Sequence, residues 1–162
     1  MQAVVFALVA ATFLTIYITQ PVLPVLSAEF GVTPAVASLT VSAVVLGIAL
    51  ANLPFGVLAD RFPIGPLVLA GGAVVALASL ACALTDRIGV LVAARFLQGL
   101  FIPAMSTCLA AYLSRMLPPH RLNVVMGWYV SATVTGGLGG RLLGGLLFPP
   151  EHWRHAFGLP HV

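Results

Sequence analysis

Residues 35–59 read AVASLTVSAVVLGIALANLPFGVLA and contain no charged side chain, and the uncharged run around them extends from residue 30 to residue 59. A helix needs about 20 mostly apolar residues to cross the hydrocarbon core of a bilayer. A strand of a membrane barrel would alternate polar and apolar residues over about ten positions, and this stretch does not alternate. The sequence therefore predicts a membrane-spanning helix here.

The rest of the chain repeats this pattern, so we expect five spans in all. Hydrophobic residues make up 60% of the 162 residues and charged residues 7%, whereas a soluble domain has about 25% charged residues. A soluble core of this size could not bury so much apolar surface. We therefore predict an all-α integral membrane protein, a transmembrane helix bundle with spans at 3–26, 35–59, 66–85, 89–114 and 122–148.

Charge and motif content exclude several other classes of protein. The net charge of +3 comes from seven scattered Arg residues, so we expect no nucleic-acid partner, which would need a basic face or run. Cys82 and Cys108 have no ligand at metal-binding spacing, and His152 and His155 fit an ordinary loop, so we expect no metal. The spans hold no nucleophile–base set, phosphate loop or acid pair, which argues against an enzyme or a cofactor.

Short links between the spans predict antiparallel neighbours and give an orientation. Basic residues concentrate in cytoplasmic loops. The links after the second and fourth spans hold Arg61, Arg115 and Arg121, whereas the opposite side holds Arg87 and Arg154. We expect these two links and the N-terminus in the cytoplasm. The chain stops soon after the fifth span, in a segment that resembles the start of another helix, so we expect a truncated protein.

Two Arg residues lie inside spans, where a charge is costly and is usually functional. Arg95 shares a helix face with Gln98, one turn further on, and we expect both to face a polar interior. The alternative for Arg95 is that its side chain reaches the headgroups. The same two interpretations remain open for Arg141, about seven residues from the end of its span.

Glycines four residues apart in the fifth span form a groove that another helix backbone could approach closely. They are Gly136, Gly140 and Gly144, with Gly145 beside them. The groove could serve static packing or a seam that moves during function.

Thr12, Thr15 and Thr19 lie on one face of the first span, with Gln20 beside them. Their hydroxyls could line a polar cavity, or they could donate to carbonyls of their own helix. Prolines, among them Pro21, interrupt several spans and are expected to bend them.

Three segments in order resemble signatures of the major facilitator superfamily of secondary transporters. The link after the second span, with Gly56, Leu58, Asp60 and Arg61, is similar to its cytoplasmic signature G-x-L-A-D-R. The segment with Arg95, Gln98 and Gly99 resembles its R-x-x-Q-G motif. The segment from Gly136 to Gly145 resembles its antiporter motif G-x3-G-P-x2-G-G, with Arg141 where that motif has Pro. Residues 17–31 look like the first span and loop of drug and sugar effluxers.

The resemblance implies a twelve-span fold of two six-span halves, in which residues 1–162 form an N-terminal half-domain that ends before span 6. It implies that Asp60 gates the cytoplasmic side and that Arg95, Gln98 and Gly99 belong to a proton-coupling network. The implied partners are a small-molecule solute, protons as the coupling ion, the lipid bilayer, and the missing C-terminal half or another copy. The implied location is a bacterial-type inner membrane.

The sequence thus favours a secondary transporter of a small solute, proton-coupled, an antiporter of the efflux type, and inactive as this fragment alone. One alternative is a membrane interaction protein that does not transport and associates through the glycines of the fifth span. Another is a small homo-oligomeric transporter, in which two copies rebuild a full pathway.

Overall fold

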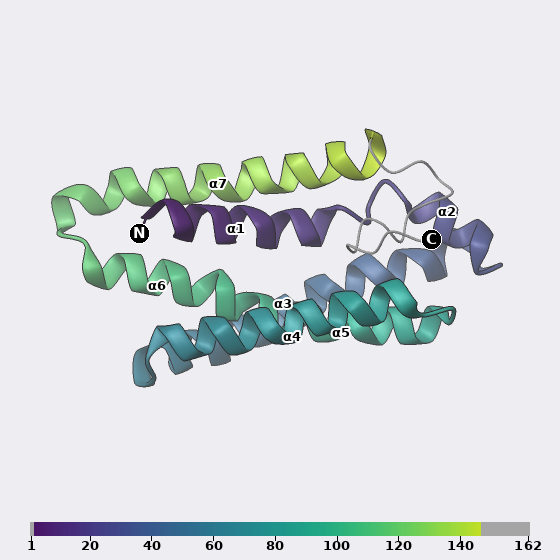
Figure 1. Cartoon of the computed structure of the whole chain (residues 1–162), viewed down its shortest axis with the longest axis horizontal. Coiled ribbons are helices and arrows are strands. Elements are labelled where there is room, and N and C mark those ends of the chain that lie inside the picture. Colours follow the sequence, from purple (N-terminus) through teal and green to yellow (C-terminus); the bar gives the residue numbers. More distant parts are fainter. Residues whose placement is uncertain (1, 147–162) are drawn as a thin grey trace.

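The computed structural model describes residues 2–146 and builds them from helices, with no strand in that range (Figure 1). The helices are, in chain order, α1 (Gln2–Tyr17), α2 (Leu23–Glu29), α3 (Pro34–Arg61), α4 (Ile64–Leu84), α5 (Ile88–Met105), α6 (Thr107–Met116) and α7 (Pro119–Leu146). The all-α class expected from the sequence is confirmed. The segment with His152, His155 and Arg154 lies outside the described residues.

Three helical runs of the described chain are long and apolar enough to cross a membrane: Pro34–Arg61, Ile64–Leu84 and Ile88–Met116. They correspond to the expected spans at 35–59, 66–85 and 89–114. Large leucine side chains on them are exposed, such as Leu53 and Leu69, more than three quarters of whose surface is open. Lipid acyl chains can cover such surfaces without a free-energy cost, since they are as apolar as Leu.

The first expected span is wrong as a single helix, because α1 ends at Tyr17 and α2 begins only at Leu23. Pro21 has no N–H to donate to the Tyr17 carbonyl, and its ring would clash with that carbonyl in a continuous helix. A short turn replaces the helix, with the Gln20 N–H donating to the Tyr17 carbonyl at 3.1 Å. Pro24 is tolerated because it lies at the start of α2.

The fourth expected span is divided as well, into α5 and α6 on either side of Ser106. Pro103 lies inside α5 and removes one backbone donor there. Ser106 keeps a helical conformation and its N–H donates to the Ile102 carbonyl at 3.0 Å, so the run bends without unwinding. The segment expected as a fifth span, 122–148, overlaps α7, which begins three residues earlier with Pro119 in its first turn and is described as far as Leu146.

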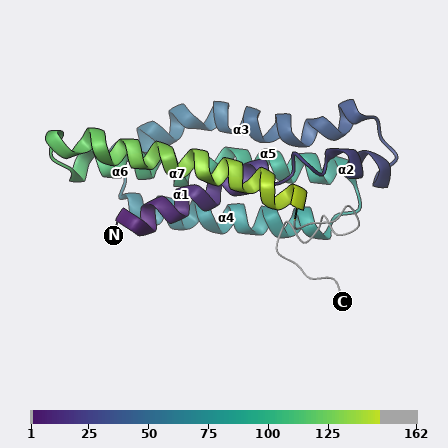
Figure 2. The same ribbon diagram turned by 90° about the horizontal axis from the view of Figure 1, so that it is seen from above.

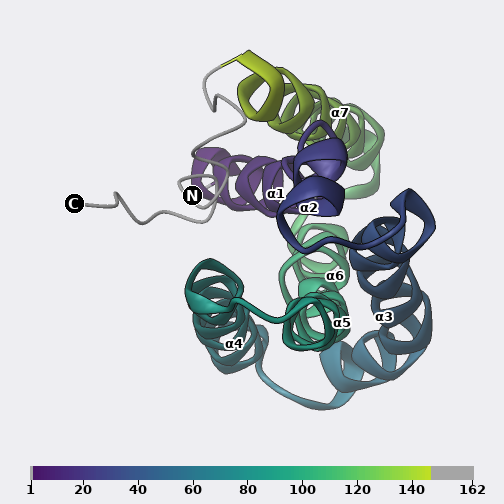
Figure 3. The same ribbon diagram turned by 90° about the vertical axis from the view of Figure 1, so that its right-hand side faces the viewer.

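The helices form two groups, α1 with α7 and α3 with α4 and α5, and α6 contacts helices of both. α5 lies between α3 and α4, as Figures 2 and 3 both show, and α1 lies beside α7 and above α5 and α6. Small residues allow the closest approach. At Gly47 of α3 an added Cβ would lie 2.7 Å from the Phe96 carbonyl oxygen of α5, and at Gly71 of α4 it would clash with Ala104.

Candidate functional site

Arg95 extends from the middle of α5 to the end of α1. Only 1% of its surface is exposed. Its Nη2 donates to the Thr19 hydroxyl at 2.7 Å and to the Ile16 carbonyl at 3.0 Å. Its Nη1 donates to the Thr15 carbonyl at 3.3 Å. Arg95 therefore faces the bundle interior, and the headgroup alternative does not describe its position.

The end of α1 is suited to receive this cation. The last carbonyls of a helix have no partner within the helix, and that end carries a partial negative charge. Since the chain leaves the helix after Tyr17, the Thr15 and Ile16 carbonyls are free to accept from Arg95. The break caused by Pro21 and the buried Arg95 are thus two parts of one arrangement, in which α5 caps α1.

Gln98 extends this contact to α4. Its Oε1 accepts from Arg95 Nη1 at 2.8 Å, and its Nε2 donates to the Ser79 hydroxyl at 2.7 Å. The Ser79 hydroxyl donates in turn to the Val75 carbonyl at 2.9 Å. Sequence reasoning missed Ser79, although it is the only hydroxyl-bearing residue of α4. The Arg95 network, meaning Arg95, Gln98, Thr19 and Ser79, therefore connects α1, α5 and α4.

A cavity of about 220 Å³ lies beside the Arg95 network, between α1 and α4. Thr12 and Thr15 line it together with Ser79. Both threonines also donate to their own helix, Thr12 to the Leu8 carbonyl at 2.7 Å and Thr15 to the Ala11 carbonyl at 2.9 Å. The two interpretations of the threonine face are therefore compatible. Gln20 is partly buried in the turn after α1.

The chemistry open to the Arg95 network is hydrogen bonding around a fixed positive charge. Arg keeps its proton in proteins, so Arg95 itself cannot release one. Among the described residues, the network contains no carboxylate and no His. It can hold α1 in position relative to α5, and it can attract a negative group, but a group that exchanges protons would have to come from elsewhere.

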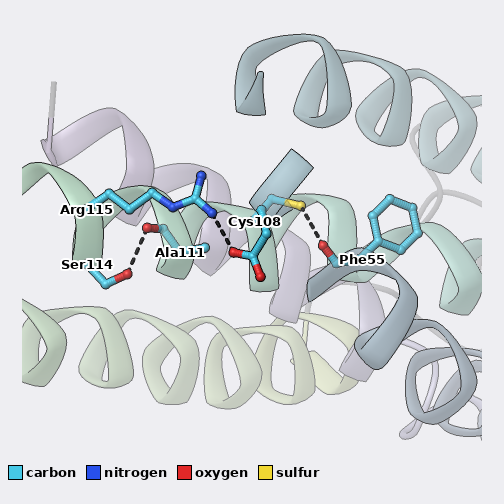
Figure 4. Close-up of polar contacts among 6 residues, drawn as sticks. Phe55, Cys108, Ala111, Ser114 and Arg115 are labelled. Atoms are coloured by element: carbon cyan, nitrogen blue, oxygen red, sulfur yellow. Dashed lines mark hydrogen bonds and ion pairs between the residues drawn. The ribbon is translucent and has the colours of Figure 1, made fainter. Parts of the chain in front are cut away.

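The cytoplasmic motif lies at the end of α3, where Asp60 forms an ion pair with Arg115 of α6 (Figure 4). Their Oδ1 and Nη2 atoms are 2.5 Å apart, and the Asp60 side chain is 75% exposed. An exposed pair of this kind contributes at most about 1 kcal/mol. Arg61 is exposed, and Gly56 and Leu58 are partly buried. In this half Asp60 thus has a partner within its own chain.

Cys108 lies two helical turns before Arg115 on α6, and its thiol faces α3 (Figure 4). Its Sγ is 3.8 Å from the Phe55 carbonyl oxygen. Cys108 and Cys82 are both free and buried, so they act as small packing residues here.

The glycine groove of α7 lies directly against the backbone of α1. A Cβ added at Gly140 would lie 2.6 Å from the Leu14 carbonyl oxygen, and one at Gly136 or Gly144 would clash with the carbonyl of Ala10 or Ile18. Gly145 leaves more room, 3.7 Å to Pro21.

Gly99, which the sequence grouped with Arg95 and Gln98, lies in the contact between α5 and α3, against Val44. The structure therefore separates it from the hydrogen-bonded side chains of the Arg95 network. Gly99 therefore allows α5 and α3 to pack closely.

Arg141 of α7 lies over the Tyr17 ring at the end of α1, with its Cζ 4.8 Å from the ring centroid. Its side chain is exposed, so Arg141 does not face a buried polar interior as Arg95 does. It does not take part in the Arg95 network, but it contacts the same end of α1 from α7. A cavity of about 210 Å³ lies beside it, between α1 and α7.

These features define a helical membrane protein with a buried cation at a helix break. A family model described as Major Facilitator Superfamily matches residues 5–161, so the chain belongs to this superfamily. It is similar to the uncharacterized MFS-type transporter YybF of Bacillus subtilis (33% identical over 97% of this chain and 40% of the relative). It is also similar to the inner membrane transport protein YnfM of Escherichia coli (34% over 90% of this chain and 35% of the relative).

A further relative is a multidrug resistance protein B homolog of Mycobacterium tuberculosis, 33% identical over 80% of this chain and 24% of the relative. The chain thus spans two fifths or less of the length of these proteins. The names of the first two are those of transport proteins, and the superfamily consists of transporters and not of enzymes. The family and the apolar helices identify a multi-pass protein of the bacterial inner membrane.

Proposed function

We propose that this chain forms the N-terminal half of a secondary transporter that moves a small solute across the inner membrane. The observation that carries the proposal is the buried Arg95, which joins the discontinuous first span to α5 and, through Gln98, to α4. Charged residues buried within membrane-spanning helices mark solute and ion pathways. Broken helices beside binding sites are typical of secondary transporters.

In this proposal Arg95 sets the position of α1 relative to α5 in one state of the transport cycle. Its fork of donors reaches three oxygens at the end of α1. A solute that bound in the neighbouring cavity would contact Thr15, whose carbonyl accepts from Arg95, and Ser79, which accepts from Gln98. Binding could then release α1, which links occupancy of the cavity to movement of the helix.

We further propose that transport is coupled to protons and runs as an efflux antiport. Arg95 serves there as the fixed cation, and the group that exchanges the proton belongs to the part of the transporter beyond residue 146. The name of the mycobacterial relative supports the efflux direction. On this view residues 1–162 alone carry no flux.

The interaction-protein alternative is weakened by the position of the α7 glycines. Gly136, Gly140 and Gly144 already face α1, so they are not open to a partner helix. No described feature favours the homo-oligomeric alternative.

The proposal can be tested in a chimera that joins residues 1–146 to the part of the E. coli relative beyond its match to this chain. Proteoliposomes with an internal pH dye would be exposed to organic cations, organic acids and sugars under an imposed proton gradient. We expect proton movement with at least one class of solute, and none with residues 1–162 alone. A folded chimera that responds to no class would contradict the proposal, and equal flux from residues 1–162 alone would favour the homo-oligomer.

A further inference from the structure

The cavity between α1 and α7 combines an aromatic wall with a cation. Phe13 and Tyr17 of α1 line one side, and Thr133, Gly137 and Arg141 of α7 line the other. We propose that Arg141 and Tyr17 bind the carboxylate of a small organic anion. This inference rests on the proposed transport function and names the class of its solute.

The stacking of Arg141 leaves its donors available. Its guanidinium covers the Tyr17 ring, with Cζ 4.8 Å from the centroid. A cation stacked on a ring uses the face of its plane, whereas the five N–H groups point outward from the edge of that plane. A planar carboxylate can accept two of them at once.

Gly137 leaves room for the Tyr17 ring in this position. A Cβ added there would lie 3.1 Å from Tyr17 Cδ2, closer than ordinary van der Waals contact. Because α7 has a glycine one turn before Arg141, the ring can lie against the helix and beneath the guanidinium.

The described residues provide Arg141 with no carboxylate partner. Their three acidic residues, Glu29, Asp60 and Asp86, lie in links or at helix ends. Asp60 is already paired with Arg115. Arg141 is exposed and lines the cavity, so its donors are open to a ligand that enters there.

A second cation strengthens the attraction. Arg95 contacts Thr15, Ile16 and Thr19, the residues around Tyr17, so the end of α1 lies between two guanidinium groups. Low-dielectric walls focus such a field and favour an anion over a neutral or cationic solute.

The size of the cavity limits what it can hold. Its volume of about 210 Å³ is below the range of about 300–1,000 Å³ typical of whole ligand sites. We infer that it takes the carboxylate and an adjacent ring or short chain, while the rest of the solute extends out of it.

Three compounds that share one body and differ in charge test the proposal: 4-fluorobenzoate, 4-fluorobenzamide and 4-fluorobenzamidine. The chain of residues 1–162 would be purified in an uncharged detergent and titrated with each, followed by ¹⁹F NMR, with protein-free micelles subtracted. We expect saturable binding of the anion only. Equal binding of the amide or the amidine, or no binding of the anion by the folded chain, would overturn the proposal.

Substitutions locate the site. Arg141→Gln should weaken binding of 4-fluorobenzoate at least about tenfold, since it removes charged hydrogen bonds. Arg141→Lys keeps the charge but loses the planar donors of the guanidinium, so it should weaken binding of 4-fluorobenzoate less. If Arg141→Gln does not elute as a folded species, the Arg141→Lys variant alone tests whether Arg141 binds the anion. Arg121→Gln, in the first turn of α7, is the matched control and should bind like the parent. Unchanged binding by Arg141→Lys and Arg141→Gln would refute the assignment.

This experiment separates the inference from the proposed function, because it measures binding without transport. A chimera that moves solutes while its parent chain binds no 4-fluorobenzoate would refute the anion site and leave the transport function intact. A chain that binds through Arg141 while the chimera moves no solute would support the anion site and contradict the transport function.

Discussion

Replacement of Gly140 by Ala tests the contact between α7 and α1. The new Cβ would lie 2.6 Å from the Leu14 carbonyl oxygen, whereas ordinary contact begins at 3.4 Å, so the helices must separate by up to about 0.8 Å. Overpacking of this kind costs about 1–3 kcal/mol. Ala is also the better helix former, by up to about 1 kcal/mol, and this gain must be removed from the comparison.

Gly139→Ala provides that control. It receives the same gain in helix propensity, and its added Cβ would meet no atom within 4 Å. The difference in stability between the two variants therefore reports the clash alone, about 1–3 kcal/mol. At roughly 2–4 °C per kcal/mol for a chain of this size, Gly140→Ala should melt ~2–12 °C below Gly139→Ala.

A thiol-reactive dye provides the assay, because the two free cysteines are fully buried and react only on unfolding. Both variants would be melted in the same detergent beside the parent chain. Equal melting temperatures for the two variants would show that α7 does not approach the α1 backbone as closely as described.

Three further predictions concern Arg95, the Asp60–Arg115 pair and the orientation of the chain. Arg95→Leu should help the isolated segment 88–116 insert into membranes by about 2.5–3.5 kcal/mol in a glycosylation assay, and yet lower the melting temperature of the whole chain, because α1 loses its cap; a more stable chain would contradict this role. A double-mutant cycle with Asp60→Asn and Arg115→Gln should give a coupling energy below about 1 kcal/mol that falls with added salt, and a larger or salt-independent value would be evidence against an exposed pair. With the native cysteines removed, Arg87→Cys should react with an impermeant maleimide from outside and Pro63→Cys should not, since the basic links face the cytoplasm; the reverse pattern refutes the orientation.

The uncharged runs predicted most of the helical segments because burial in lipid imposes a simple rule on composition. The helices α3 and α4 differ from the expected spans by only a few residues. The pairing of Arg95 with Gln98 also followed from spacing, since residues three apart meet on one helix face, and their side chains are 2.8 Å apart.

The break in the first span was beyond a hydropathy argument, because apolar composition is the same on both sides of it. The signal was Pro21, which was expected only to bend the helix. Whether a proline bends or ends a helix depends on which groups donate to the carbonyls left without a partner. Here Arg95, far away in the sequence, donates to the Thr15 and Ile16 carbonyls.

Ser79 and Gly99 also show that sequence position does not determine which residues join the Arg95 network. Ser79 joins the Arg95 network from another helix, and only the packing of α4 against α5 reveals it. Gly99 is adjacent to Gln98 in the sequence, yet it lies on the side of α5 that packs against α3. Position in the chain does not determine which neighbour a helix face will meet.

Proton-driven flux in vesicles that contain the chimera tests the central claim most directly. It would be measured for the parent, for Arg95→Lys and Arg95→Leu, and for Arg121→Gln as the control. Lys keeps the charge but cannot provide the planar fork that reaches three oxygens of α1. We expect flux from the parent and from Arg121→Gln, a large loss in Arg95→Lys, and none in Arg95→Leu. Parent-level flux from a folded Arg95→Leu chimera would contradict the account.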